Sequence, residues 1–295
     1  MNKIKIFEML LRDGLQSLNP YSLDIKINCL KELVKNNYYF IEYGSNTSSI
    51  LLPQMKDSDK ILNYIKENYN NSLTKFGILV SSYRYLSKDI LLNNDSFSFV
   101  CSLDDTFSFS NLKKSALESF NDILKSINII FKYHSYIRNI RIYISFAFNG
   151  KSNDESVNLY SYFSNIYYIM KLHNISHEIV DIVFSDTVNV STPEILFDIL
   201  SMYTYEKKKY ISLHLHCGKN FKNLIDTALK MKINKFDCCL CNIGGCPFSG
   251  IQMYSNVSTL ELVKYLHQNN FITNLDEDIL FESEKNINNL LNLYN

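Results

Sequence analysis

Glycine, proline and tryptophan are scarce in this chain of 295 residues, and their scarcity limits the architectures it can adopt. It has eight glycines, four prolines and no tryptophan, and no stretch rich in glycine and proline divides it. Exposed linkers between domains are commonly built from such stretches. The sequence therefore favours one large folded unit, for which 46% hydrophobic residues supply a sizeable core.

Neither sign of charge is in excess, because 30 lysines and arginines match 30 aspartates and glutamates. A balanced chain offers no broad cationic field, so we expect neither a nucleic-acid nor a membrane partner. No apolar run has the length of a membrane helix, and a strand-like run already begins at Ile4, which leaves no room for a signal peptide. An odd number of cysteines, seven, suits reduced thiols, so we expect a cytoplasmic protein.

Eight apolar and β-branched runs alternate with amphipathic segments along the chain. Strands are expected at Ile4–Leu10, Tyr39–Tyr43, Lys75–Val80, Phe97–Leu103, Ile140–Phe148, Ile179–Phe184, Tyr210–Leu215 and Phe236–Cys241. Helices are expected at Leu23–Val34, Asp57–Asn68, Lys114–Phe131, Ser156–Leu172, Pro193–Tyr203, Phe221–Met231 and Ser258–His267. Eight strand-then-helix units predict an α/β fold, a (β/α)₈ TIM barrel, with an open doubly wound sheet as the alternative.

Polar residues at or just beyond the C-terminal ends of the expected strands favour the barrel over the open sheet. They are Arg12, Asp13, Glu42, Asp186, His214, His216 and Cys246. A closed barrel brings these strand ends together on the face where TIM-barrel active sites lie. We expect residues 1–273 to form the catalytic barrel and residues 274–295 a short C-terminal helical extension.

A pair of histidines near the end of the seventh expected strand is a candidate metal site. His214 and His216 are two residues apart, so on a strand both side chains face the same way. Such a pair can bind one divalent cation, although a structural pair is an equal alternative. Asp13 would add a carboxylate oxygen and Asn256 an amide oxygen, and this mixed set suits Mg²⁺ or Mn²⁺ better than a structural zinc.

Two further residues are candidates for the chemical step. The guanidinium of Arg12 is permanently charged and suits an enolate oxygen, while a surface salt bridge to Asp13 is the alternative. Cys246 follows two glycines and precedes a proline, so it lies on a loop, either as a thiol that enters the site or as a turn residue. Glu42 and Asp186 could support metal ligands, handle protons or form internal ion pairs.

Together these segments resemble one enzyme family, the hydroxymethylglutaryl-CoA lyases, which are metal-dependent TIM-barrel lyases related to isopropylmalate and homocitrate synthases. The resemblance extends from Ile4 to about Leu266. The segments that carry it are Leu11–Gln16, Ile41–Glu42 with Ser45 and Pro53–Met55, Asp186–Val188 with Thr192–Pro193, His214–His216 and Gly244–Phe248.

The resemblance implies a carbon–carbon lyase that cleaves 3-hydroxy-3-methylglutaryl-CoA to acetyl-CoA and acetoacetate. It implies a divalent cation held by Asp13, His214, His216 and Asn256. It implies catalytic roles for Arg12, Cys246, Asp186 and Glu42, with Asp13 or Asp186 as the proton handler, and substrate contacts from Arg12, Gln16 and Ser45. It further implies an acyl-CoA as the bound partner, and it suggests a homodimer.

Three alternatives remain open at this point. A Claisen-type condensing acyltransferase of the isopropylmalate or homocitrate synthase kind would use the same barrel in the opposite direction. A lyase for another acyl-CoA is suggested by Ser17–Pro20, which replaces the polar and basic residues usual after the first motif. A decayed, non-catalytic barrel belongs to another class, and the joint survival of Arg12, Asp13, both histidines and Cys246 argues against it.

Overall fold

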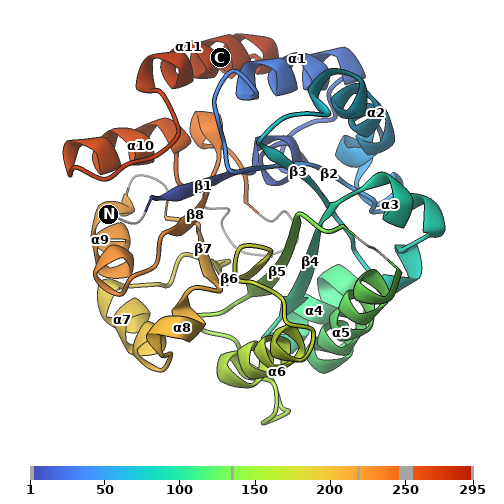
Figure 1. Ribbon diagram of the computed structural model, residues 1–295, viewed down its shortest axis with the longest axis vertical. Coiled ribbons are helices and arrows are strands. Elements are labelled where there is room, and N and C mark those ends of the chain that lie inside the picture. Colours follow the sequence, from blue (N-terminus) through green and yellow to red (C-terminus); the bar gives the residue numbers. More distant parts are fainter. Residues whose placement is uncertain (1–2, 134–135, 218–219, 246–254, 294–295) are drawn as a thin grey trace.

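Eight parallel strands form a closed barrel at the centre of the molecule. The computed structural model describes residues 3–133, 136–217, 220–245 and 255–293. Each strand pairs with the next along the chain, and β8 pairs in parallel with β1 to close the ring. Helices surround this ring (Figure 1), which confirms the TIM barrel and rules out the open sheet.

The strands are β1 (Lys5–Glu8), β2 (Phe40–Ser45), β3 (Lys75–Leu79), β4 (Ser96–Ser102), β5 (Asn139–Ser145), β6 (Val180–Asp186), β7 (Ile211–Leu215) and β8 (Lys235–Cys238). The α-helices are α1 (Leu23–Leu33), α2 (Ser58–Tyr69), α3 (Lys88–Asn93), α4 (Asp105–Leu112), α5 (Ala116–Tyr133), α6 (Leu159–Leu172), α7 (Pro193–Ser201), α8 (Tyr205–Lys208), α9 (Lys222–Lys230), α10 (Thr259–Gln268) and α11 (Glu277–Leu291).

The first two strands differ at their ends from the prediction. β1 stops at Glu8, because Leu10–Gly14 forms a π-helical turn rather than the end of a strand. Such turns are rare and occur frequently at functional sites. β2 continues to Ser45 with a bulge after Glu42, so Glu42 lies within the strand instead of ending it.

The cysteine-rich end of β8 was predicted wrongly. The strand ends at Cys238, and Leu240–Asn242 forms a 3₁₀ turn in which Cys241 has a φ of 71°. Cys238 and Cys239 are buried, as expected of small apolar side chains, but the segment does not alternate as a strand to its last cysteine. The turn redirects the chain toward Gly244 and Gly245, both at φ 116°.

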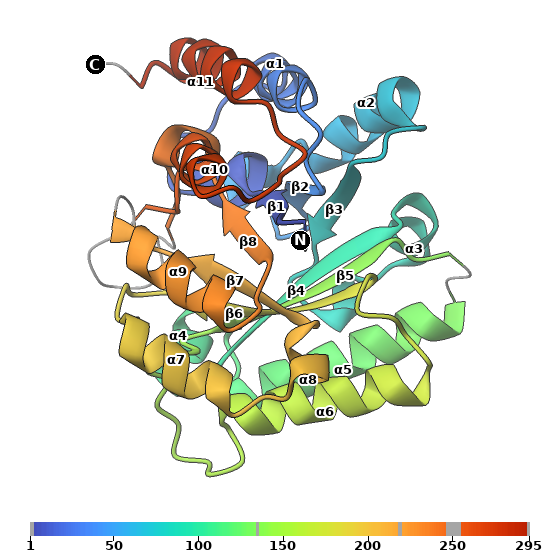
Figure 2. The same cartoon turned by 60° about the vertical axis from the view of Figure 1, so that its left-hand side comes forward.

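Local capping signals explain where several helices begin. The Thr192 side chain accepts a hydrogen bond from the backbone N–H of Ile195, and Pro193 occupies the first turn of α7. Asp276 caps α11 in the same way, through Asp278 and Ile279. This last helix lies beside α1 (Figures 1 and 2), where Ser283 donates to the carbonyl of Glu32 at 3.1 Å.

The hydrophobic core has two main parts, besides a small cluster of Phe107, Phe146 and Val188. The larger part lies between the sheet and the surrounding helices. The smaller part fills the barrel itself and comprises Phe7, Met9, Phe40, Tyr143 and Val183. Inside a TIM barrel, branched apolar side chains usually fill every layer. Here the buried charged residues Arg141, Asp181 and Asp237 also point inward.

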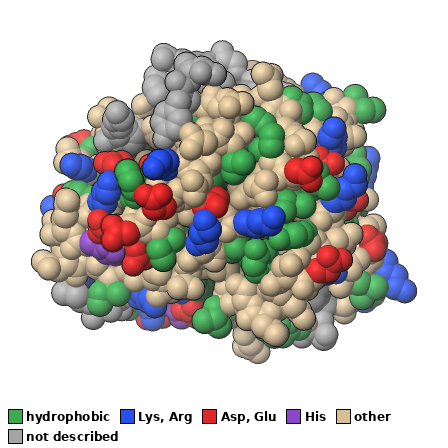
Figure 3. Space-filling model, turned by 90° about the horizontal axis from the view of Figure 1, so that it is seen from above, with side chains coloured by type: hydrophobic (Ala, Val, Ile, Leu, Met, Phe, Trp, Pro, Cys, Tyr) green, Lys and Arg blue, Asp and Glu red, His purple; other side chains and the backbone are tan. Residues whose placement is uncertain are grey.

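One face of the molecule shows how the charges are distributed. On the face in Figure 3, basic and acidic side chains are interspersed, without a large area of one sign. This distribution agrees with the equal numbers of acidic and basic residues in the sequence. Among the described residues, no helix combines the length and the apolar character needed to cross a membrane.

Candidate metal and substrate site

Three buried side chains with metal-ligand chemistry meet at the C-terminal end of the barrel. His214 belongs to β7, His216 follows that strand directly, and Asp13 lies on the π-helical turn after β1. The Nε2 atoms of the two histidines are 2.7 Å apart, and Asp13 Oδ2 lies 3.9 Å from His214 Nε2. One ligand atom of each residue lies within 4.8 Å of the others.

Asn256 completes this group from the segment before α10. Its Nδ2 donates to Asp13 Oδ2 at 2.6 Å and to the carbonyl of Ile243 at 3.1 Å. Gly244 makes room for the amide, because a Cβ at that position would lie 2.1 Å from Asn256 Nδ2 and 3.0 Å from Asp13 Oδ2. The glycine that precedes Gly245 and Cys246 in the motif is therefore required by the site itself.

The residues present fit a divalent cation. Ligands on opposite sides of a six-coordinate Mg²⁺ are about 4 Å apart, since each lies about 2.1 Å from the ion. Two buried atoms of the group, His216 Nδ1 and Asn256 Oδ1, have no hydrogen-bond partner among the described residues. An unpartnered amide oxygen beside a carboxylate and two imidazoles is the oxygen and nitrogen donor set that Mg²⁺ or Mn²⁺ accepts.

Neighbouring charges and burial keep Asp13 and His216 in the protonation states that bind a metal. Burial alone would raise the pKa of Asp13, but Arg12, followed by His214 and His216, outweighs it and holds the pKa well below its usual range. Burial and the neighbouring His214 lower the pKa of His216 to about 3. An ionised carboxylate and a neutral imidazole are the forms that bind a metal.

Arg12 is buried beside the metal candidates and does not form a surface salt bridge. Its Nε donates to Glu42 Oε2, its Nη1 donates to Asp13 Oδ1 at 2.6 Å, and its guanidinium lies 5.4 Å from the centre of the Tyr143 ring. Burial opposes the positive charge, but Glu42 and Asp13 outweigh it and keep the pKa above its usual value. The guanidinium is thus a fixed cation between two carboxylates.

A cavity of about 360 Å³ opens over this group. Arg12, Asp13, Gln16, His214 and His216 all line it, and Gln16 also donates to Asp13 Oδ1 at 2.7 Å. Residues of the lining to which the sequence analysis gave no role are Thr47, Leu51, Leu52, Leu79, Ser81, Val100, Phe107, Ser110, Asn111, Leu112, Lys113, Tyr143, Ser145, Ser185 and Thr187. Those on β4, β5 and β6 sit in inward-facing positions that strand alternation could have identified.

Two predicted residues lie elsewhere. Asp186 faces away from the barrel interior, and its carboxylate accepts the N–H groups of Val190 at 2.9 Å and Ser191 at 3.1 Å. Ser45 bonds the carbonyl of Leu79 and lines a separate cavity outside the barrel. The structure therefore does not bring Asp186 or Ser45 to the lining of the main pocket.

The remaining predicted residue, Cys246, lies outside the described residues. Its motif is described as far as Gly245, and the chain is described again from Ser255. The two ends of this interval flank the site, because Gly244 and Asn256 are in contact there. The role of Cys246 therefore stays a prediction from sequence.

Comparison with known proteins extends these observations. The cytoplasmic 3-hydroxy-3-methylglutaryl-CoA lyase of Rattus norvegicus is 27% identical over 285 residues, which cover 92% of this chain and 77% of the rat protein. The hydroxymethylglutaryl-CoA lyase of Pseudomonas mevalonii is 25% identical, covering 94% and 88%. The mitochondrial enzyme of Homo sapiens is 27% identical, covering 98% and 86%. The resemblance to hydroxymethylglutaryl-CoA lyases is confirmed.

Solved structures of such lyases share the fold. One from Brucella melitensis has a TM-score of 0.81 at 22% identity and covers 99% of this chain and 100% of its own. One from Acinetobacter baumannii, in complex with coenzyme A and 3-methylmalate, has a TM-score of 0.79 at 22% identity, covering 98% and 92%. No protein-family model matches the chain.

Proposed function

We propose that this protein is a carbon–carbon lyase that cleaves 3-hydroxy-3-methylglutaryl-CoA to acetyl-CoA and acetoacetate with Mg²⁺ or Mn²⁺. One observation carries the proposal: Asp13, His214 and His216 lie together beside Arg12 on the wall of one pocket. The similarity to hydroxymethylglutaryl-CoA lyases over nearly the whole chain supports it.

Four residues would hold the cation in this proposal. Asp13 contributes a carboxylate oxygen, His214 and His216 contribute Nε2, and Asn256 contributes Oδ1, the atom without a partner among the described residues. The bound cation would polarise the oxygens of the substrate and lower the pKa of its hydroxyl group. Gly244 is part of this arrangement because only a residue without Cβ fits against the amide of Asn256.

The protein's side chains would then accept the hydroxyl proton of the substrate and stabilise the negative charge that develops on the enolate oxygen. Loss of the hydroxyl proton makes that oxygen a carbonyl, breaks the adjacent carbon–carbon bond and moves its electron pair into the thioester as an enolate. Of the two carboxylates considered for the proton, only Asp13 lines the pocket, so the proposal assigns the proton to Asp13. Arg12 stabilises the enolate oxygen. Glu42 orients Arg12 by accepting a hydrogen bond from the Nε of Arg12.

The enolate of acetyl-CoA must finally gain a proton at carbon. Cys246 is proposed as the donor on the basis of its sequence motif, since a thiol can deliver a proton to a carbanion-like centre. Acetoacetate is released by the cleavage itself, so no oxidant or reductant is required. Atoms balance with one hydroxyl proton lost and one carbon-bound proton gained.

An acyl-CoA fits the pocket as a substrate class. Coenzyme A and 3-methylmalate occur together in the structure of the similar lyase from Acinetobacter baumannii. Among the described residues of the lining, the basic side chains are those of Arg12 and Lys113, and both suit an anionic substrate. Leu51, Val100 and Phe107 add an apolar wall.

Turnover of 3-hydroxy-3-methylglutaryl-CoA by purified protein with Mn²⁺ tests the proposal. We expect equal amounts of acetyl-CoA and acetoacetate, and we expect Arg12→Ala to lower kcat about 10²- to 10³-fold because the enolate loses its fixed cation. Arg138→Ala, which removes an arginine outside the site, is the matched control and should leave kcat unchanged. Parallel Mn²⁺ titrations of all three proteins show whether a loss of turnover reflects a loss of metal.

The outcome that rejects this function is a wild-type protein that binds Mn²⁺ and forms neither product. Cleavage of another acyl-CoA would then be examined, with the same arginine variant.

A cytoplasmic location belongs to the proposal as well. The similar rat protein, a cytoplasmic enzyme, supports it, whereas the similar human protein is mitochondrial. The predicted homodimer also remains to be tested, by light scattering.

A further inference from the structure

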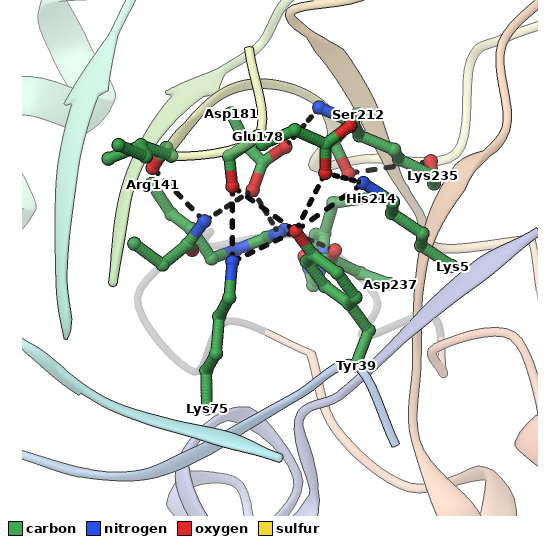
Figure 4. A network of polar contacts seen from close by, with 12 residues as sticks. Lys5, Tyr39, Lys75, Arg141, Glu178, Asp181, Ser212, His214, Lys235 and Asp237 are labelled. Atoms are coloured by element: carbon green, nitrogen blue, oxygen red, sulfur yellow. Dashed lines mark hydrogen bonds and ion pairs between the residues drawn. The ribbon is translucent and has the colours of Figure 1, made fainter. Parts of the chain in front are cut away.

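A buried chain of charges connects the candidate metal site with the opposite end of the barrel. Figure 4 shows its members pointing toward one another from several strands. His214 Nδ1 lies 3.2 Å from Asp237 Oδ2, and Asp237 Oδ1 accepts a hydrogen bond from Arg141 Nη2. Arg141 Nη1 continues to Asp181 at 3.3 Å, and Lys235 bonds the other oxygen of Asp181 at 2.7 Å.

These charges lie where apolar side chains would normally pack. His214 and Asp237 are neighbours in the register of β7 and β8, and both point into the barrel. Asp237 is 2% exposed and Arg141 is fully buried. Buried ion pairs seldom stabilise a fold more than apolar residues of the same size would, because both charges must leave water. Their presence beside a candidate ligand therefore requires a reason other than stability.

Arg141 is held rigidly, and it holds Asp237 in turn. Its guanidinium lies 3.8 Å from the centre of the Phe7 ring and 5.3 Å from that of Phe40. Its Nε donates to the hydroxyl of Tyr143 at 3.4 Å. With Asp181 on one side and Asp237 on the other, the planar group has a single orientation, which fixes the carboxylate of Asp237 against His214.

The hydrogen-bonding capacity of a carboxylate decides the tautomer of the imidazole. An ionised carboxylate can only accept, so the atom facing Asp237 Oδ2 must be a protonated Nδ1. A neutral imidazole with its proton at Nδ1 has its lone pair at Nε2, the atom that faces Asp13 and His216. His216 differs, because its Nδ1 has no partner among the described residues.

We propose that Asp237 is a positioning residue that keeps His214 in the tautomer whose Nε2 lone pair faces the metal. Arg141 serves this role by fixing the carboxylate from behind. The inference rests on the proposed metal site, and it extends that site to a residue that carries no recognisable motif in the sequence. Asp237 touches neither substrate nor metal and acts through His214 alone.

Asp237→Asn is the decisive variant. Its Oδ1 can still accept from Arg141, but its Nδ2 then faces His214 Nδ1 as a donor, which moves the imidazole proton to Nε2. We expect Mn²⁺ affinity, measured by electron paramagnetic resonance of free Mn²⁺, to fall about 10- to 100-fold. Asp57→Asn is the matched control, because it neutralises another buried carboxylate, the partner of Lys26, without touching Arg141, Asp237 or His214, and its Mn²⁺ affinity should equal that of wild type.

A second measurement reads the tautomer of His214 directly. In metal-free wild-type protein labelled with ¹⁵N-histidine, long-range proton–nitrogen spectra report which ring nitrogen of His214 is protonated, and His214→Ala identifies the signals. A proton at Nδ1 that moves to Nε2 in Asp237→Asn supports the inference. A proton at Nε2 in wild type overturns it, as does an equal loss of Mn²⁺ affinity in Asp57→Asn.

The failure of the metal site and that of the positioning role are distinguishable. A wild-type protein that binds no Mn²⁺ overturns the metal site, and with it this inference, whatever the tautomer of His214. A wild-type protein that binds Mn²⁺ with His214 protonated at Nε2 overturns the role of Asp237 alone and leaves the proposed function intact.

Discussion

The two ends of the barrel interior are both polar, but their side chains are satisfied differently. At the N-terminal end, each charged group meets an opposite charge or a hydrogen-bond acceptor. Lys5 pairs with Glu178, Lys235 pairs with Asp181, and Lys75 donates to the hydroxyl of Tyr39 at 2.9 Å. The charged groups at this end therefore pair with one another, and Asn139 Oδ1 beside them is a buried polar atom without a partner among the described residues.

At the C-terminal end, buried polar atoms are left without partners. They include Glu42 Oε1, Ser185 Oγ, His216 Nδ1 and Asn256 Oδ1, and the described part of the chain provides no hydrogen bond for any of them. An unpartnered buried polar atom costs about 1–3 kcal/mol, so a fold selected only for stability would not gather four of them beside one cavity. Buried charges alone therefore do not indicate a functional site, whereas buried polar atoms that lack hydrogen-bond partners beside a cavity do.

The largest effect should come from a change at the C-terminal end. His214→Ala removes a proposed ligand, so Mn²⁺ affinity should fall by more than the roughly 10- to 100-fold expected for a residue that only supports a ligand. At a Mn²⁺ concentration about 100 times the wild-type Kd, metal binding stabilises the wild-type fold by about 2.7 kcal/mol. Thermal unfolding should therefore show a Mn²⁺-dependent increase in Tm for wild type only. An equal increase in His214→Ala would mean that the metal binds elsewhere.

A smaller effect is expected at Glu8, the last residue of β1. Its carboxylate accepts the N–H groups of Leu10 and Leu240, both at 3.0 Å, and the hydroxyl of Thr259 at 2.7 Å. Burial raises the pKa of Glu8 to about 7 in spite of these donors. The folded state therefore holds a proton that the unfolded chain releases above its ordinary pKa near 4.5.

The sign of the pH effect follows from that difference. Because the folded pKa is raised, the contribution of Glu8 to stability is complete below about pH 4.5 and is lost as the pH rises through 7, a change on the order of 3 kcal/mol. His216, whose pKa is lowered to about 3, acts with the opposite sign over part of this range. The difference in unfolding free energy between wild type and Glu8→Gln cancels the histidine effect and should show the Glu8 slope. A difference in unfolding free energy that urea titrations find to be the same at every pH from 4.5 to 7 would contradict the prediction.

The smallest effect is expected at the N-terminal end. Lys5→Met removes a partly exposed ion pair with Glu178, whose side chain is 55% exposed, so solvent already screens the interaction. We expect the unfolding free energy to fall by less than about 1 kcal/mol. Mn²⁺ affinity and turnover should stay at wild-type values. A loss of either would show that the paired end also takes part in function, and the comparison of the two ends would fail.

Much of the fold followed from periodicity, but three helices did not. The segment Asp105–Leu112 alternates phenylalanine with serine or threonine, a period typical of a strand, yet it forms α4. Its helix is set by the caps, because Asp104 accepts from the N–H of Phe107 and Lys113 ends the helix at a φ of 57°. The helices at Lys88–Asn93 and Tyr205–Lys208 are too short to display a helical period.

Site residues could be predicted from the sequence where the ends of the strands carried recognisable motifs. The motif residues Asp13, His214 and Arg12 do meet, because the barrel gathers its strand ends. The structure turns Asp186 away from the pocket, since Asp181 of the same strand points inward and successive side chains of a strand alternate between its two faces. Asp237 was missed because a single carboxylate within a buried strand becomes meaningful only when its neighbour across the sheet is known.

Metal reconstitution tests the central claim most directly. Protein stripped of metal with a chelator is titrated with Mn²⁺, and turnover of 3-hydroxy-3-methylglutaryl-CoA is measured at each point, with His214→Ala treated in parallel. We expect no turnover in the stripped protein, a linear rise with bound Mn²⁺ that ends at one ion per chain, and no recovery in His214→Ala. Turnover that persists in the stripped protein, or that returns equally in His214→Ala, would contradict the assignment of this end of the barrel as a metal-dependent lyase site.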